Sequence, residues 1–176
     1  MENTDNLFSE VDNFAKLKEK ISTSEQFYTR FNKEIRRKKK ASSKTFTQLK
    51  KILSEEKFPY HIVNDLTQNG AIVVGRAIQQ IKLANIDLFI TELIKHNCIS
   101  TITILTFILS KKQIIGIKDK IKEYLYKCMT EEQNIPFYKL LLIIQRNYNE
   151  MMDENIYFYC KTNYHPILKE ILENKK

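Results

Sequence analysis

The sequence is poor in the residues that form tight turns, because only three glycines and three prolines occur among its 176 residues. A β-sandwich or β-barrel joins many short strands through turns that depend on Gly, Pro, Asn and Asp. The scarcity of Gly and Pro therefore argues against an all-β fold. Hydrophobic residues make up 43% of the chain and include ten Phe and nine Tyr, which is enough apolar surface for a core. The length corresponds to about one domain.

Patterns that carry metal or catalytic chemistry are also missing from the sequence. The three cysteines, Cys98, Cys128 and Cys160, are far apart and form no C-x-x-C pair, which excludes a zinc ribbon or a dithiol redox motif. The three histidines form no H-E-x-x-H pattern. The chain has neither a G-x-S-x-G nucleophile motif nor a complete Gly-rich phosphate loop. We therefore expect no metal, no cofactor and no enzymatic activity.

No long apolar run is present either. A membrane-spanning helix needs about 20 consecutive apolar residues, whereas the longest apolar-looking stretch, residues 99–109, is short and rich in Thr. The amino-terminal residues are polar and acidic, and they lack the apolar segment of a secretory signal. We expect an intracellular protein without a membrane span, located in the nucleus or the cytoplasm.

What the sequence does contain is a helical spacing of apolar residues, clearest between residues 86 and 128. Residues 86–94 place five large apolar side chains at i, i+3, i+4, i+7 and i+8, which is one face of a helix. The pattern restarts after Asn97 and again after Gly116. Short connections favour antiparallel neighbours, so we expect a central layer of three helices. The predicted core consists of Phe89, Ile90, Leu93, Leu105, Ile108, Ile121, Leu125, Leu141 and Ile144.

Further apolar stripes flank this central layer. Ser22 and Glu25 form a predicted capping box, and Asn69-Gly70 is predicted to end a helix through a left-handed residue. The β-branched residues 72–74 are compatible with a strand, but the helical period continues through them and favours a helix. Residues 157–159 fit either a helix turn or an extended piece. The flanking stripes occupy residues 7–21, 27–35, 46–53, 62–66, 74–81, 137–148 and 167–172.

Together these segments predict an all-α fold, a compact bundle of about eight or nine helices. No sequence repeat of constant length is visible. We divide the chain into a helical amino-terminal arm with a basic stretch, residues 1–44, and a helical core domain, residues 45–176. Both parts are expected to form one globular unit.

Positive charge is concentrated in one stretch of the chain. Residues 33–57 contain ten Lys or Arg and three Glu, a net charge of +7, whereas the whole chain carries +8. Such a cluster can bind phosphates or an acidic surface, although it also fits a nuclear-import signal or a solvated helix face. The residues expected to contact nucleic acid or an acidic partner are Lys33, Arg36, Arg37, Lys38, Lys39, Lys40, Lys44, Lys50 and Lys51.

Aromatic and methionine side chains crowd into residues 148–164. One helix face cannot bury all of them, so some are expected to form an adaptable surface for a protein partner. The alternative is that they close the end of the bundle. The residues expected to contact a partner are Tyr148, Met151, Met152, Tyr157 and Tyr159.

Two stretches resemble known helical families. Residues 93–124, with I-T-I-L at 102–105 and I-K-D-K-I-K at 117–122, resemble the amino-terminal helical domain of elongation factor TFIIS and the related integrase-binding domain of a chromatin tether. That resemblance lacks the T-G-I-G-K signature, and it implies a bundle that holds disordered peptide motifs of nuclear partners.

The second resemblance involves residues 83–93, which are similar to a central helix of the poxviral apoptosis inhibitors with the Bcl fold. Asn69-Gly70 with Gly75-Arg76 is similar to their first homology box, with one residue too many and no Trp. This resemblance implies a groove for an amphipathic partner helix.

These observations predict a non-enzymatic helical protein-interaction module that associates with nucleic acid or a nuclear assembly through its basic cluster. The alternative is a helix-in-groove regulator that resembles the viral Bcl-fold inhibitors. A protein partner is expected in both cases, and nucleic acid only in the first.

Overall fold

The computed structural model describes residues 25–55, 58–131 and 134–174. Within these ranges all regular structure is helical and no strand occurs, which confirms the predicted all-α fold. The predicted apolar stripe over residues 7–21 and the capping residue Ser22 lie outside the described residues. No helix in the described ranges is both long and apolar enough to cross a bilayer.

The described chain begins with a helix over residues 25–38, and short turns or loops join it to the helices that follow. Two of these are short 3₁₀ helices, η1 and η2. In chain order the elements are α2 (Ser43–Ser54), η1 (Tyr60–Asp65), α3 (Gln68–Gln79), α4 (Ile86–Leu93), α5 (Ile99–Lys111), α6 (Lys118–Met129), α7 (Ile135–Asn147), η2 (Asn149–Met151), α8 (Glu154–Thr162) and α9 (Pro166–Glu173).

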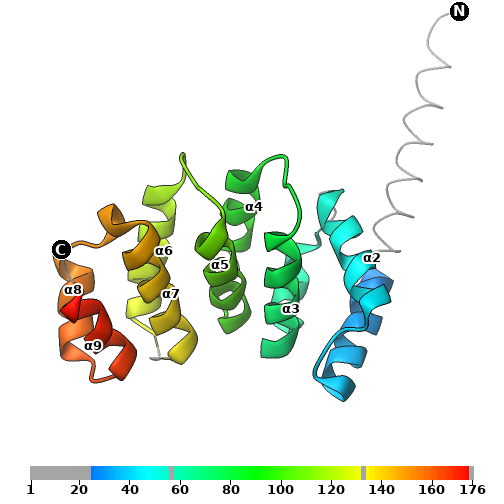
Figure 1. Cartoon of the computed structure of the whole chain (residues 1–176), viewed down its shortest axis with the longest axis horizontal. Helices are drawn as coiled ribbons and strands as arrows, with labels where there is room; N and C mark the ends of the chain where they lie inside the picture. Colours follow the sequence, from blue (N-terminus) through cyan, green and yellow to red (C-terminus); the bar gives the residue numbers. More distant parts are fainter. Residues whose placement is uncertain (1–24, 56–57, 132–133, 175–176) are drawn as a thin grey trace, which may run out of the picture.

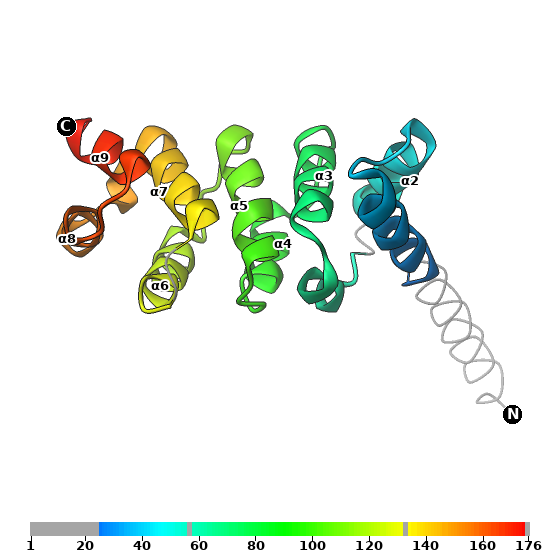
Figure 2. The same ribbon diagram turned by 90° about the horizontal axis from the view of Figure 1, so that it is seen from below.

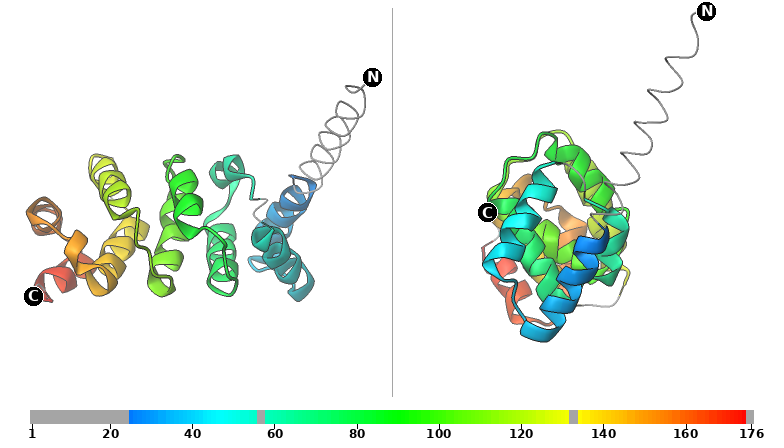
Figure 3. Two further views of the ribbon diagram at one scale, coloured as in Figure 1. Left: turned by 90° about the horizontal axis from the view of Figure 1, so that it is seen from above. Right: turned by 90° about the vertical axis from the view of Figure 1, so that its right-hand side faces the viewer.

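The helices form a row of pairs arranged in two layers (Figures 1 and 2). One layer contains α3, α5, α7 and α9, and each of these helices packs against the next. The other layer contains α4, α6 and α8, with η1 beside α4 (Figure 3). The expected single layer of helices over residues 86–128 is therefore wrong, because α5 packs between α3 and α7 in the opposite layer from α4 and α6. The starts of α4, α6 and α8 are separated by 32 and then 36 residues. A structural repeat is therefore present, but its varying length hides it from a search for a fixed period.

Side-chain caps explain where several helices begin. Asn85 accepts a hydrogen bond from the Leu88 amide at 2.9 Å, and Asn134 accepts one from the Phe137 amide at 2.9 Å. Each cap satisfies an amide that has no partner within the first turn of its helix. Asp153 and His165 cap α8 and α9 in the same manner.

The predicted helix end at Asn69-Gly70 is wrong. The Thr67 hydroxyl accepts a hydrogen bond from the Gly70 amide at 3.1 Å, so α3 starts here and Gly70 lies in its first turn. A polar residue that caps a helix start three positions before a glycine is stronger evidence than the glycine is for a helix end. The predicted helix over residues 72–74 is confirmed, and residues 157–159 lie within α8.

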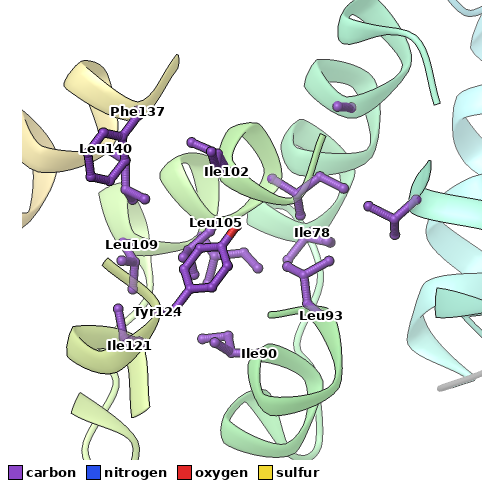
Figure 4. Packing of buried hydrophobic residues seen from close by; sticks show 14 of the residues in the cluster. Ile78, Ile90, Leu93, Ile102, Leu105, Leu109, Ile121, Tyr124, Phe137 and Leu140 are labelled. Atoms are coloured by element: carbon purple, nitrogen blue, oxygen red, sulfur yellow. The ribbon is translucent and has the colours of Figure 1, made fainter. Parts of the chain in front are cut away.

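The core lies between the two layers and is continuous along the row. All nine predicted core residues are buried, and Figure 4 shows Leu93, Leu105 and Ile121 converging from three helices. Helix α5 is the most enclosed element, because even Thr101 and Thr103 are buried on it. Where α3 meets α5, a Cβ atom on Gly75 would lie 2.7 Å from Cβ of Phe107, so only glycine permits this approach.

Candidate functional site

The predicted basic residues lie together at the end of the row opposite α9, on the helix over residues 25–38, on α2 and on the turn between them (Figure 1). We call these residues the basic cluster. Eight are exposed and Lys50 is half-buried. The cluster consists of Lys33, Arg36, Arg37, Lys38, Lys39, Lys40, Lys44, Lys50 and Lys51.

The helix over residues 25–38 separates an apolar face from this charged face. Phe27, Phe31 and Ile35 are buried against the rest of the row, as their spacing predicts, and Tyr28 is buried beside them. Arg36 and Arg37 follow the last buried position and project from the final turn. Packing of the apolar stripe therefore fixes which residues of this helix face solvent.

The turn after this helix is held by one acidic side chain. Lys39 has a φ of 60°, which reverses the chain, and its amide donates to the Ile35 carbonyl at 2.8 Å. Glu34 accepts hydrogen bonds from the Ser42 amide at 3.0 Å and from the Thr45 hydroxyl at 2.5 Å. The Thr45 hydrogen bond lowers the pKa of the Glu34 carboxyl, so the group is ionised at neutral pH. The basic residues therefore extend from an ordered turn.

Sequence reasoning missed one cation of this surface, Arg30. This exposed residue lies seven positions before Arg37, two turns away on the same face of the helix. Arg30, Lys44 and Gln48 line a shallow groove between the helix over residues 25–38 and α2. The i, i+7 spacing of Arg30 from Arg37 is the sequence signal that places both on one helix face, although Arg30 lies outside the dense run of cations.

The aromatic side chains around the basic cluster serve packing. Phe31 is 1% exposed. Phe46 is half-buried, and the Lys50 ammonium lies 5.4 Å from the centre of its ring. Such a cation–π contact covers the ring face that a nucleic-acid base would need for stacking. The chemistry that this surface offers is therefore that of ammonium and guanidinium donors.

The second predicted site, near the carboxyl end, is mostly interior. Tyr148, Met151, Met152 and Tyr159 are buried, and Tyr157 is half-buried. The buried members belong to the core, and the Tyr148 hydroxyl donates a hydrogen bond to the Lys112 carbonyl at the end of α5. Binding of a partner by these five residues stays a prediction.

The exposed aromatic residues of the same segment are Phe158, at 67% exposure, and Tyr164. Phe158 lies beside an apolar groove between α6 and α8 that is also lined by Tyr126 and Met129. The spacing of the buried residues Ile156 and Tyr159 on α8 places Phe158 on the outer face. This helical period was available in the sequence, but the segment was not assigned to a helix.

One ionic contact joins α6 to the start of α8 at the edge of this groove. The Lys122 ammonium lies 2.7 Å from the Asp153 carboxylate, which also accepts a hydrogen bond from the Tyr126 hydroxyl. Burial by itself raises the pKa of the Asp153 carboxyl, but the hydrogen bonds from Lys122 and Tyr126 outweigh it and hold the pKa at about 2. Asp153 also caps α8 through the Ile156 amide, so one side chain orients both walls of the groove.

The cysteines occupy interior positions. Cys128 and Cys160 are buried and Cys98 is half-buried, and all three are free thiols. Burial raises the pKa of the Cys128 and Cys160 thiols to about 11, so both remain protonated and weakly nucleophilic at neutral pH. Within the described ranges no three His, Cys, Asp or Glu side chains are grouped in a manner that could hold a metal ion.

Comparison of the chain with protein-family models, with curated proteins and with solved structures found no match. The function must therefore be inferred from the surface chemistry of the chain itself. The basic cluster and the apolar groove between α6 and α8 are two surfaces of the described residues that offer distinct chemistry.

Proposed function

We propose that the protein is a non-enzymatic helical interaction module whose basic cluster contacts the phosphates of nucleic acid. The observation that carries the proposal is the concentration of charge. Residues 33–57 hold a net charge of +7 out of +8, and the exposed members of the cluster lie on two adjacent helices and one ordered turn. The other residues of the chain together carry a net charge of only +1, the difference between +8 and +7.

The expected binding mode depends on charge and not on base sequence. Lys and Arg side chains that neutralise phosphates release condensed counterions, which makes affinity steeply dependent on salt. Because Phe31 is buried and Phe46 is covered by Lys50, stacking of bases on these rings contributes little. We therefore expect contacts to the phosphate backbone that position the module on nucleic acid without reading its sequence.

The test is a salt titration of binding to generic DNA and RNA. In one variant the five residues from Arg36 to Lys40 are changed to Gln. In the matched control, five exposed lysines elsewhere on the row are changed to Gln, namely Lys111, Lys120, Lys127, Lys139 and Lys161. Both variants lose the same charge, so only the placement of that charge differs between them.

The cluster variant should lose affinity, and its log–log salt slope should flatten by roughly one for each lost phosphate contact. The control should retain most of the wild-type affinity and slope. Absence of binding by the wild type at low salt, or equal losses in both variants, would show that the cluster does not form a nucleic-acid site. The cluster would then be a solvated face, an import signal or a docking site for an acidic protein surface.

A second candidate function is supported by the groove between α6 and α8. Tyr126, Met129 and the exposed Phe158 offer apolar contacts of the kind that an amphipathic helix uses when it docks into a groove. Changing Phe158 to Asp should abolish binding of such a partner and leave nucleic-acid binding unchanged. If the cluster variant instead abolishes both, the two surfaces do not act separately.

A further inference from the structure

A second apolar groove lies at the other end of the α4, α6 and α8 layer, where η1 meets α4. It is lined by Tyr60, Leu83, Asn85, Leu88, Phe89 and Glu92. Leu88 is 53% exposed and Phe89 is buried, so the groove has an apolar floor and an apolar rim. Tyr60 forms one wall, with its ring centre 5.3 Å from that of Phe89.

The described chain begins beside this groove. The Glu25 carboxylate lies 3.8 Å from the imidazole of His61, which is the residue next to Tyr60. Tyr28, one turn further along the same helix, contacts Phe58 with ring centres 5.7 Å apart, and Phe58 contacts Phe89 at 5.4 Å. Glu25, the first described residue, therefore lies next to the wall of the groove.

The sequence before Glu25 has a complementary property. Residues 7–21 carry an apolar stripe with polar residues between its members, consisting of Leu7, Val11, Phe14, Leu17 and Ile21. A short amphipathic segment is only marginally stable in water and needs a surface for its apolar face. Its charged residues balance, and Glu92 at the groove rim is already paired with Lys95 at 2.6 Å, so the complementarity consists of the apolar stripe alone.

We infer that residues 7–21 of the chain dock in the groove formed by η1 and α4, with Leu88 as the principal contact for their apolar stripe. Only residues 22–24 separate the stripe from the described helix, so the docking partner is held next to the groove by the chain itself. Such a short tether produces a high effective concentration, and modest contacts then suffice for docking. This inference does not depend on nucleic-acid binding by the basic cluster.

The test uses the full chain and measures tryptic cleavage at Lys16, Lys18 and Lys20 by mass spectrometry. Cleavage of a docked segment follows the population of its undocked form. We expect Leu88→Asp on the groove side and Phe14→Asp on the segment side each to accelerate cleavage by about tenfold relative to the wild type, because both open the contact. Leu88 is exposed, so its replacement leaves the fold intact.

Two matched controls introduce the same charge elsewhere. Phe158→Asp changes an exposed apolar residue on α8, far along the row, and Asn13→Asp changes a polar position of the segment. Both should be cleaved within twofold of the wild-type rate. The inference is overturned if the wild type is cleaved as fast as Phe14→Asp, or if Leu88→Asp behaves as Phe158→Asp does. Protection that increases with protein concentration would also overturn it, because a second copy would then occupy the groove.

Discussion

The two ends of the helix row use their charged side chains differently. At the end formed by α6 to α9, cations lie opposite carboxylates of other elements, as in Lys122 with Asp153 at 2.7 Å and Arg146 with Glu170. At the other end, Lys38 lies 3.7 Å from Glu34 of its own helix, and most of the basic cluster extends into solvent. The first arrangement ties helices together. The second leaves charge available for an external partner, so stability and binding should respond to different substitutions.

The largest effect is expected in the shared core that joins the two ends. Changing Ile121 to Ala removes a fully buried side chain of α6 and should lower the free energy of unfolding by about 2–5 kcal/mol. Leu93→Ala on α4 should cost a similar amount. Denaturant unfolding measures both values, with Leu88→Ala as an exposed control on α4. A loss below about 1 kcal/mol for both buried sites would contradict a continuous core.

A second substitution tests the contact between α3 and α5, through which the two ends are joined. Gly75→Ala places a methyl group against Cβ of Phe107, an atom that cannot move without its helix. Overpacking of this kind should destabilise the protein by about 1–3 kcal/mol. Gly116, whose added Cβ would meet only the Asp87 carboxylate at 3.1 Å, provides the control in a loop. Equal unfolding midpoints for wild type and Gly75→Ala would disprove the close approach.

The ionic contact between α6 and α8 should be visible in the pH dependence of stability. The Asp153 carboxyl has its pKa lowered from 3.8 to about 2 in the folded protein. The ionised carboxylate therefore contributes roughly 2 kcal/mol to the free energy of unfolding. This contribution is present above about pH 4 and is lost as the pH falls through about 2. Asp153→Asn retains a helix-capping side chain but removes the charge, so it should abolish this pH-dependent part.

The control for this ionic contact is Glu170→Gln. The pair of Arg146 and Glu170 is more exposed, with side-chain exposures of 56% and 41%, and exposed pairs contribute less than about 1 kcal/mol. Thermal unfolding of both variants between about pH 2 and pH 7 separates the two cases. A stability curve for Asp153→Asn that is parallel to the wild type would show that Lys122 and Tyr126 do not hold the carboxylate.

The smallest effect on stability is expected at the basic cluster. Changing all five residues from Arg36 to Lys40 to Gln should alter the free energy of unfolding by no more than about 0.5–1 kcal/mol, because exposed side chains contribute little to the fold. The same denaturant experiment measures it. A larger loss would mean that the cluster, like the opposite end, uses its charge to hold helices together.

The fold was largely predictable from the sequence, and the surfaces were less so. Apolar periodicity identified helices and buried positions, because the same 3.6-residue spacing that makes a stripe also directs it inward, as at Phe89 and Ile121. Gly70 was misinterpreted because a glycine signals a helix end only in the absence of a stronger local cap such as Thr67. Tyr148 is buried and donates a hydrogen bond to the Lys112 carbonyl, 36 residues away, and local patterns do not encode such a contact.

The candidate sites also differ in whether local sequence patterns or contacts between distant segments determine them. Placement of the basic cluster on an exposed face follows from the stripe of Phe27, Phe31 and Ile35, which the sequence contains. The groove beside Leu88 requires η1 and α4 to lie next to each other, and no local pattern predicts which two helices are neighbours. The order of helices along the row had to come from the structure.

The row of helix pairs also fixes the distance between its surfaces. From α2 through α3, α5 and α7 to α9 the chain makes four successive helix contacts, and at about 8–10 Å for each contact the ends are roughly 32–40 Å apart. The groove between α6 and α8 lies short of the α9 end, so a ligand in it and a ligand on the basic cluster would be separated by less than this full length. If both surfaces bind partners as proposed, the row of helices would set the spacing between those partners.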